Sequence, residues 1–141
     1  HICGEPEQDY TPRLTELHEK EIVIFHGTVR DMTKIYKDIS CTIHPSYYPE
    51  GLSNVLLESC ASARPIITTD RAGCKEVVDD GVNGYICKQN DSADLIKQIE
   101  KFLSLSWENR RNMGLEGRKK VEKEFNREIV IQKYLKELEE V

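Results

Sequence analysis

Residues 41–69 read CTIHPSYYPEGLSNVLLESCASARPIITT, and this stretch decides the fold. Residues 41–44 and 65–69 are short runs rich in apolar and β-branched residues, and a proline ends the first run and opens the second. Both runs predict strands. Residues 54–63 predict a helix between them. Because the strands read as continuous rather than alternating apolar runs, they are typical of a parallel sheet that is covered on both faces.

The alternation of strands and helices continues on both sides of this stretch. Further strands are predicted at residues 22–26, as a buried strand before Gly27, and at residues 84–87, after an Asn83-Gly84 turn. Further helices are predicted at residues 11–20, 31–38, 92–105, 107–125 and 126–138, with Ser92 as the N-cap of the third. This order predicts an α/β fold with a doubly wound, Rossmann-like parallel sheet. Residues 1–141 are expected to form a single domain, with residues 126–141 as a terminal helix.

Composition excludes several classes of protein. The 141 residues carry 20 Lys plus Arg against 25 Asp plus Glu, a net charge of −5, which argues against a nucleic-acid partner. No apolar run approaches the roughly 20 residues that span a bilayer. The five cysteines are widely spaced and form no C-x-x-C pair, which favours buried thiols in a reducing compartment over disulfides. Cysteine and histidine do not cluster as metal ligands, so no metal is expected.

The loop at residues 45–54 is the most unusual segment of the chain. It follows a strand and precedes a helix, and in open parallel sheets ligands bind at this edge, where helix N-termini present free N–H groups. Gly51 allows close approach to the backbone, and Ser53 or Asn54 could cap the helix. The positive end of the helix suits a diphosphate. Since a phosphate would repel Glu58, that carboxylate is expected to face groups that donate to it, such as sugar hydroxyls.

The segment from Glu50 to Glu58 resembles the E-x7-E motif of the family-4 retaining glycosyltransferases, which have the two-domain GT-B fold. The segments on both sides of the motif are also similar to the family. They are His44-Pro45-Ser46 before the motif, residues 63–70 in the strand after it, and residues 72–85, which contain E-x-x-x-D-G-x-x-G and lead into the last strand. The resemblance covers nearly the whole chain. It implies that residues 1–141 are the C-terminal, nucleotide-sugar-binding half of a GT-B enzyme.

The resemblance also implies a role for each site residue. Glu50 would be the catalytic-site carboxylate that contacts the hydroxyls of the donor sugar. The backbone of Gly51, Leu52 and Ser53 would hold the sugar, and that of Asn54 and Val55 the diphosphate. Glu58 would accept hydrogen bonds from the ribose. The loop at residues 27–30, with Val29, matches the position where the family's backbone meets the base.

The family also uses an Arg and a Lys from an upstream G-R-x-x-x-x-K-G-like segment that this sequence does not contain. The chain is therefore expected to be truncated at its N-terminus, to lack the acceptor domain, to bind donor weakly and to transfer nothing alone. The implied reaction is retaining, hexosyltransferase-type transfer from a nucleotide-sugar, expected to be a UDP-sugar, to an unidentified glycan, lipid or other acceptor. The enzyme would act without metal or cofactor, in polysaccharide biosynthesis. The expected location is the cytoplasm, with peripheral contact to the inner face of the membrane left open.

Simpler interpretations stand beside these roles. His44 could touch the donor or be structural, and Tyr47 and Tyr48 could stack on a ligand or be ordinary loop aromatics. Glu76 could lie near the acceptor or cap a helix. A non-catalytic nucleotide- or partner-binding module of the same fold is the alternative function. The sequence contains neither the G-x-G-x-x-G turn of dinucleotide enzymes nor a phosphate-binding G-x-x-x-x-G-K-[S/T] loop.

Overall fold

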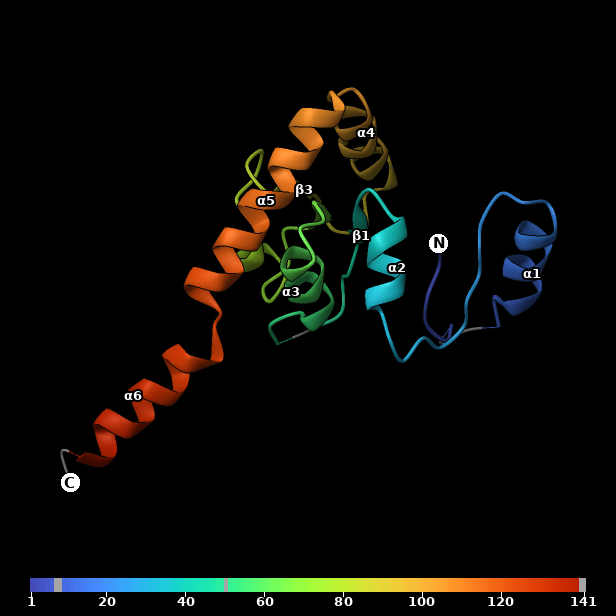
Figure 1. The fold of residues 1–141 in the computed structure, drawn as a ribbon. Helices are drawn as coiled ribbons and strands as arrows, with labels where there is room; N and C mark the ends of the chain where they lie inside the picture. The colour runs from blue at the N-terminus through green and yellow to red at the C-terminus, as the bar shows by residue number, and fades with distance from the viewer. Residues whose placement is uncertain (7–8, 50, 140–141) are drawn as a thin grey trace. The chain divides into compact units, whose positions relative to one another are not determined.

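The computed structural model describes residues 1–6, 9–49 and 51–139, which divide into two compact units, residues 1–39 and 40–141. The N-terminal unit contains α1 (Thr11–Glu19) and α2 (Thr33–Asp38) (Figure 1). The expected buried strand at residues 22–26 is wrong. Phe25 forms only an isolated parallel bridge with Ile2, and Ile22 and Ile24 are 65% and 46% exposed. Within the described part of this unit, one short extended segment supplies too few partners to extend the pairing.

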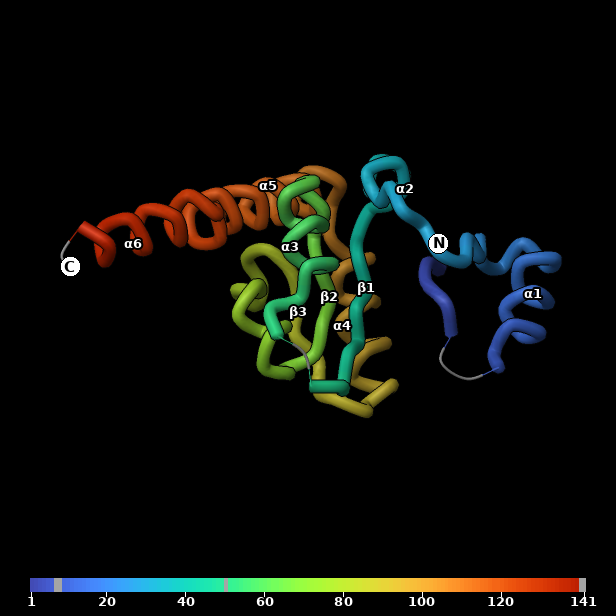
Figure 2. Tube along the Cα trace, turned by 90° about the horizontal axis from the view of Figure 1, so that it is seen from below, coloured from blue at the N-terminus to red at the C-terminus, as the bar shows by residue number. Residues whose placement is uncertain are grey.

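The C-terminal unit contains the sheet and the remaining helices. Its elements are, in chain order, β1 (Thr42–His44), α3 (Asn54–Ala61), β2 (Ile66–Thr69), the 3₁₀ turn η1 (Lys75–Val77), β3 (Gly84–Cys87), α4 (Ser92–Leu103), α5 (Trp107–Glu124) and α6 (Arg127–Glu139). The described strands lie side by side in the order β1-β2-β3, as Figure 2 shows, and both pairs are parallel. Ile66 pairs with Thr42 on one side and Gly84 on the other. The expected parallel α/β sheet is confirmed.

Adjacent residues of β2 point to opposite faces of the sheet, and each face has its own core. Ile66 belongs to a cluster with Leu56 and Cys60 of α3 and with Val121 of α5. Ile67 belongs to a second cluster, which includes Tyr85, Phe102 and Met113. Because side chains alternate along a strand, the continuous Ile66-Ile67 pair requires helices on both sides. This two-sided cover explains why all four residues of β2 are buried.

Helix α5 packs closely against α3 because two of its contact positions are glycines. A Cβ at Gly114 would overlap the Ala63 carbonyl oxygen, and one at Gly117 would lie 3.2 Å from Cys60 Sγ. The Arg118 guanidinium also donates to the Ala61 carbonyl oxygen at the end of α3. These contacts fix α3, and with it the loop that leads into α3, against the rest of the unit.

The ends of the later helices refine the expectations from the sequence. Asp91, not Ser92, is the N-cap of α4, because its side chain accepts a hydrogen bond from Asp94 N at 2.9 Å. No described residue of α6 is buried. Its apolar side chains are largely exposed, with Tyr134 at 69% and Leu138 at 72%. None of the helices in the described ranges is long and apolar enough to cross a membrane.

Candidate functional site

The carboxyl ends of β1 and β2 hold the start of the unusual loop in place. Thr68 Oγ1 donates to the His44 carbonyl oxygen at 2.7 Å, and Thr69 Oγ1 donates to the Ser46 carbonyl oxygen at 2.5 Å. Both threonines are at most 1% exposed. A hydroxyl that is buried in this way needs a partner, so these bonds tie the loop to the sheet edge at two successive positions.

The N-terminus of α3 is built to present backbone N–H groups. Ser53 is the N-cap residue and is 5% exposed, but its side chain makes no capping hydrogen bond. The first turn of α3 contains no acidic residue. The helix dipole therefore has no side-chain counter-charge on its own first turn. Gly51 leaves open space beside the loop, since a Cβ there would meet nothing within 4 Å. This arrangement suits an anionic ligand.

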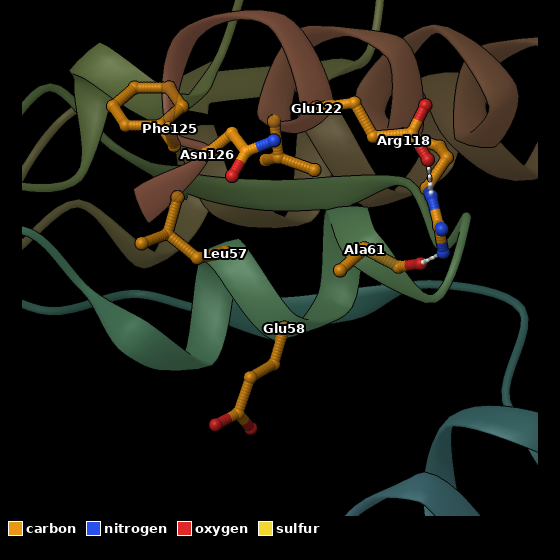
Figure 3. A pocket seen from close by; sticks show the side chains of 8 residues that line it. Leu57, Glu58, Ala61, Arg118, Glu122, Phe125 and Asn126 are labelled. Carbon is orange, nitrogen blue, oxygen red and sulfur yellow. Dashed lines mark hydrogen bonds and ion pairs between the residues drawn. The ribbon is translucent and has the colours of Figure 1, made fainter. Parts of the chain in front are cut away.

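Glu58 lies one turn further along α3, on an exposed face. It borders a groove of about 340 Å³ between α3 and α5, whose wall includes Leu57, Val121 and Phe125. In Figure 3 the Glu58 side chain points away from the Arg118 and Phe125 side chains of this groove. Its carboxylate makes no hydrogen bond or ion pair with any residue that the structure describes. It is therefore available to accept hydrogen bonds from a ligand.

The turn after β2, residues 70–76, lies against the start of α3. The Ser53 N–H donates to the Gly73 carbonyl oxygen at 2.9 Å. Glu76 Oε2 accepts a hydrogen bond from the Gly73 N–H at 2.7 Å, just before the 3₁₀ turn η1, which favours the capping role considered for Glu76. Arg71, in the same turn, has a buried Nε without a hydrogen-bond partner among the described residues. The only signal that the sequence carries for Arg71 is a basic residue just after a strand end.

A second hollow, also of about 340 Å³, lies at the same edge of the sheet. Its lining includes Tyr47, Thr69, Lys88 and Asp91. The Tyr47 and Tyr48 rings stack with centroids 4.3 Å apart, and the Tyr47 hydroxyl donates to that of Tyr48 at 2.9 Å. Both rings are 48% exposed, so the pair forms a half-exposed aromatic surface beside the loop.

The structure brings together most of the site residues predicted from the sequence. Six of these residues lie on α3 or directly before it: Gly51, Leu52, Ser53, Asn54, Val55 and Glu58. Glu50 lies outside the described residues. Val29 belongs to the N-terminal unit, residues 1–39, and not to the unit that contains α3. Among described residues, no three His, Cys, Asp or Glu side chains are grouped as metal ligands would be. The expectation of a metal-free site stays a prediction.

Comparison with known proteins identifies relatives along most of the chain. The family described as "Glycosyl transferases group 1" matches residues 1–120. The capsular polysaccharide biosynthesis glycosyltransferase CapM of Staphylococcus aureus is 31% identical over 108 residues, which cover 77% of this chain and 28% of CapM. The N-acetyl-alpha-D-glucosaminyl L-malate synthase of Bacillus anthracis is 29% identical over 120 residues, 84% of this chain and 30% of that enzyme. The chain thus spans less than a third of these two relatives.

Solved structures share the fold. The crystal structure of Anabaena Alr3699/HepE in complex with UDP aligns with a TM-score of 0.83 at 19% identity, over 99% of this chain and 40% of that one. The C-terminal domain of a group 1 glycosyl transferase (LpcC) from Francisella tularensis aligns with a TM-score of 0.67 at 21% identity, over 84% of this chain and 64% of that one. These alignments confirm the predicted fold, that of the C-terminal half of a GT-B glycosyltransferase. Together with the match over residues 1–120, they confirm the resemblance seen in the sequence, and the chain belongs to the group 1 glycosyl transferases.

Proposed function

We propose that this chain binds a nucleotide-sugar, a UDP-sugar, as the donor domain of a retaining glycosyltransferase. The proposal is supported mainly by the polar groups at the start of α3. There the side chain of the buried Ser53 makes no capping hydrogen bond, the first turn carries no acidic residue, and the carboxylate of Glu58, one turn later, has no partner among the described residues.

The spacing on α3 matches the chemistry of a nucleoside diphosphate. The diphosphate would accept hydrogen bonds from the backbone N–H groups of Asn54 and Val55 at the positive end of the helix. Glu58 follows Asn54 by four residues, about 6 Å along the helix axis. At that distance its carboxylate would accept hydrogen bonds from ribose hydroxyls without lying against the phosphates. One helix then serves two parts of the donor with groups of opposite polarity.

The remaining roles follow the family resemblance. The backbone of Gly51, Leu52 and Ser53 would hold the sugar, and Glu50 would contact its hydroxyls near the reacting carbon. Val29 would meet the base. The reaction breaks the bond between the sugar and the diphosphate, so negative charge grows on the departing diphosphate. Preorganised N–H groups at the start of α3 would stabilise that charge without a metal ion.

Structural neighbours support nucleotide binding. The Anabaena protein HepE aligns with a TM-score of 0.79 in a crystal structure that contains UDP-glucose. A Staphylococcus aureus TarM variant, which aligns with a TM-score of 0.77, was solved with UDP. The acceptor is proposed to be a glycan or a lipid-linked glycan. We further propose that this chain alone binds donor and does not transfer, because it spans less than a third of relatives such as CapM.

Calorimetric titration of the chain with UDP, GDP, ADP and uridine tests the donor site. UDP is expected to bind most tightly, and Glu58→Ala is expected to weaken it by about tenfold, the loss of one charge-assisted hydrogen bond. Glu100→Ala is the matched control, because Glu100 is an exposed carboxylate on α4 and the net charge changes equally. Absence of nucleotide binding by the folded chain at millimolar concentration would contradict the donor site and favour a binding module for another partner.

A further inference from the structure

Arg71 carries a polar group that the fold leaves unpaired. Its Nε is buried from solvent and has no hydrogen-bond partner among the described residues. No ion pair between described residues involves Arg71. A buried donor without a partner costs about 1–3 kcal/mol, and more when the group is charged. Native structures rarely keep such a group unless a ligand or ion completes it.

The turn that carries Arg71 lies beside the start of α3. The Arg71 carbonyl oxygen accepts hydrogen bonds from Cys74 N at 3.1 Å and Lys75 N at 2.9 Å, which closes the turn tightly. The Gly73 carbonyl oxygen in that turn accepts the Ser53 N–H at 2.9 Å. Arg71 is two residues from Gly73, at most about 7.6 Å between their Cα atoms. An arginine side chain can cover that distance, so the guanidinium lies within reach of the helix N-terminus.

The nearby carboxylates are engaged elsewhere. Asp70 Oδ1 accepts a hydrogen bond from Gln89 Nε2 at 2.9 Å. Glu76 Oε2 accepts the Gly73 N–H at 2.7 Å and so holds the turn itself. The first turn of α3 contributes no acidic side chain. The fold therefore brings the turn that carries Arg71 next to a helix N-terminus, and Asp70, Glu76 and the first turn of α3 supply no free anion there.

We propose that Arg71 is a binding residue for the diphosphate of the donor, an inference that rests on the proposed function. A guanidinium offers a planar set of N–H donors that matches phosphate oxygens, and its charge persists at any physiological pH. The diphosphate would lie between this guanidinium and the N–H groups of α3, neutralising both. It would also give the buried Nε–H the acceptor that it lacks within the chain.

Isothermal titration of the 141-residue chain with UDP, inorganic pyrophosphate and uridine tests this role. Arg71→Gln is expected to weaken UDP and pyrophosphate by about tenfold to hundredfold, and uridine, which lacks phosphate, by less than twofold. Arg71→Lys keeps the charge but loses the planar fork, so its affinity is expected to be intermediate. Arg64→Gln is the matched control, because Arg64 lies just before β2, at the opposite edge of the sheet, and the charge change is the same. Thermal melts of each variant establish that the fold is kept.

The outcomes separate this inference from the function on which it rests. If UDP binds to wild type and to Arg71→Gln equally, the role of Arg71 is overturned while the donor site stands. Equal weakening by Arg64→Gln and Arg71→Gln would also overturn it, since net charge alone would then explain the loss. If pyrophosphate binding depends on Arg71 but UDP binds no more tightly than pyrophosphate, the anion site stands and the nucleotide site fails.

Discussion

Ser59 Oγ donates a hydrogen bond to Thr42 Oγ1 at 2.8 Å and so joins α3 to β1. Ser59 is fully buried, and its hydroxyl also lies 3.3 Å from the Arg64 carbonyl oxygen. The bond connects the middle of α3 to the strand that precedes the loop at residues 45–53. It therefore fixes the helix N-terminus relative to the edge of the sheet from which the loop leaves.

Removal of this hydrogen bond is expected to destabilise the chain. Ser59→Ala leaves Thr42 Oγ1 without its partner, and we expect a loss of about 1–2 kcal/mol in the free energy of unfolding. A double-mutant cycle with Thr42→Val, measured by urea denaturation, isolates the pair. A coupling energy of about 0.5–1.5 kcal/mol is expected. Strictly additive losses would show that the two hydroxyls do not interact.

Gly114→Ala is expected to destabilise the chain although it places a better helix former in α5. In a free helix this substitution stabilises by about 1 kcal/mol. Here the new Cβ would overlap the Ala63 carbonyl oxygen, so α5 must move away from α3, and a net loss of about 1–3 kcal/mol is expected. Gly51→Ala is the control, because a Cβ there meets open space. An unchanged melting temperature for Gly114→Ala would contradict the close packing of α3 and α5.

The prediction for alkaline pH concerns Cys41. Burial raises the pKa of this thiol from 9.0 to about 12. Because the folded pKa lies above the unfolded value, the stability that this thiol contributes is fully present below pH 9 and is lost as the pH rises through about 12. Denaturant midpoints measured from pH 8 to pH 11 are expected to fall. Cys41→Ala should flatten that slope, and an equally steep slope in the variant would assign the fall to other groups.

The proposed contact between Glu58 and the ribose predicts a specific non-additivity. Removing the carboxylate with Glu58→Ala and removing its donor with 2′,3′-dideoxy-UDP should each weaken binding by about tenfold. Because both changes delete the same contact, the combined loss should not exceed the larger single loss by much. Dissociation constants from calorimetry check this. Fully multiplicative losses would mean that Glu58 and the ribose hydroxyls act independently.

Local apolar patterns predicted the strands and helices of the C-terminal unit. The Ile66-Ile67 pair predicted a strand that is covered on both faces, and each of these two residues lies in a buried cluster of its own. Residues 22–26 carry a similar apolar pattern, yet Ile22 is 65% exposed. A run of β-branched residues favours extended backbone, but its burial depends on partners that distant parts of a chain must supply.

In the candidate site too, some features follow from local sequence and others depend on contacts between distant parts of the chain. The loop before α3 and the position of Glu58 on its exposed face follow from proline, glycine and helical spacing, all of which are local. The N-cap of α4 was placed one residue late, since Asp91 and Ser92 are both capping residue types and only the Asp94 N–H decides between them. Arg71 could not be singled out at all. Its unpaired Nε results from packing, and its proximity to α3 results from the Ser53–Gly73 hydrogen bond.

The most direct test of the donor site is the backbone amide spectrum of the ¹⁵N-labelled chain during titration with UDP. The account predicts saturable shifts at residues 51–58 and at Arg71, while the amides of α4 and of residues 105–120 in and before α5 stay unchanged. Glu58→Ala should reduce these shifts at equal UDP concentration. Shifts centred on the groove between α3 and α5, or no shifts at millimolar UDP, would contradict a nucleotide site at the N-terminus of α3.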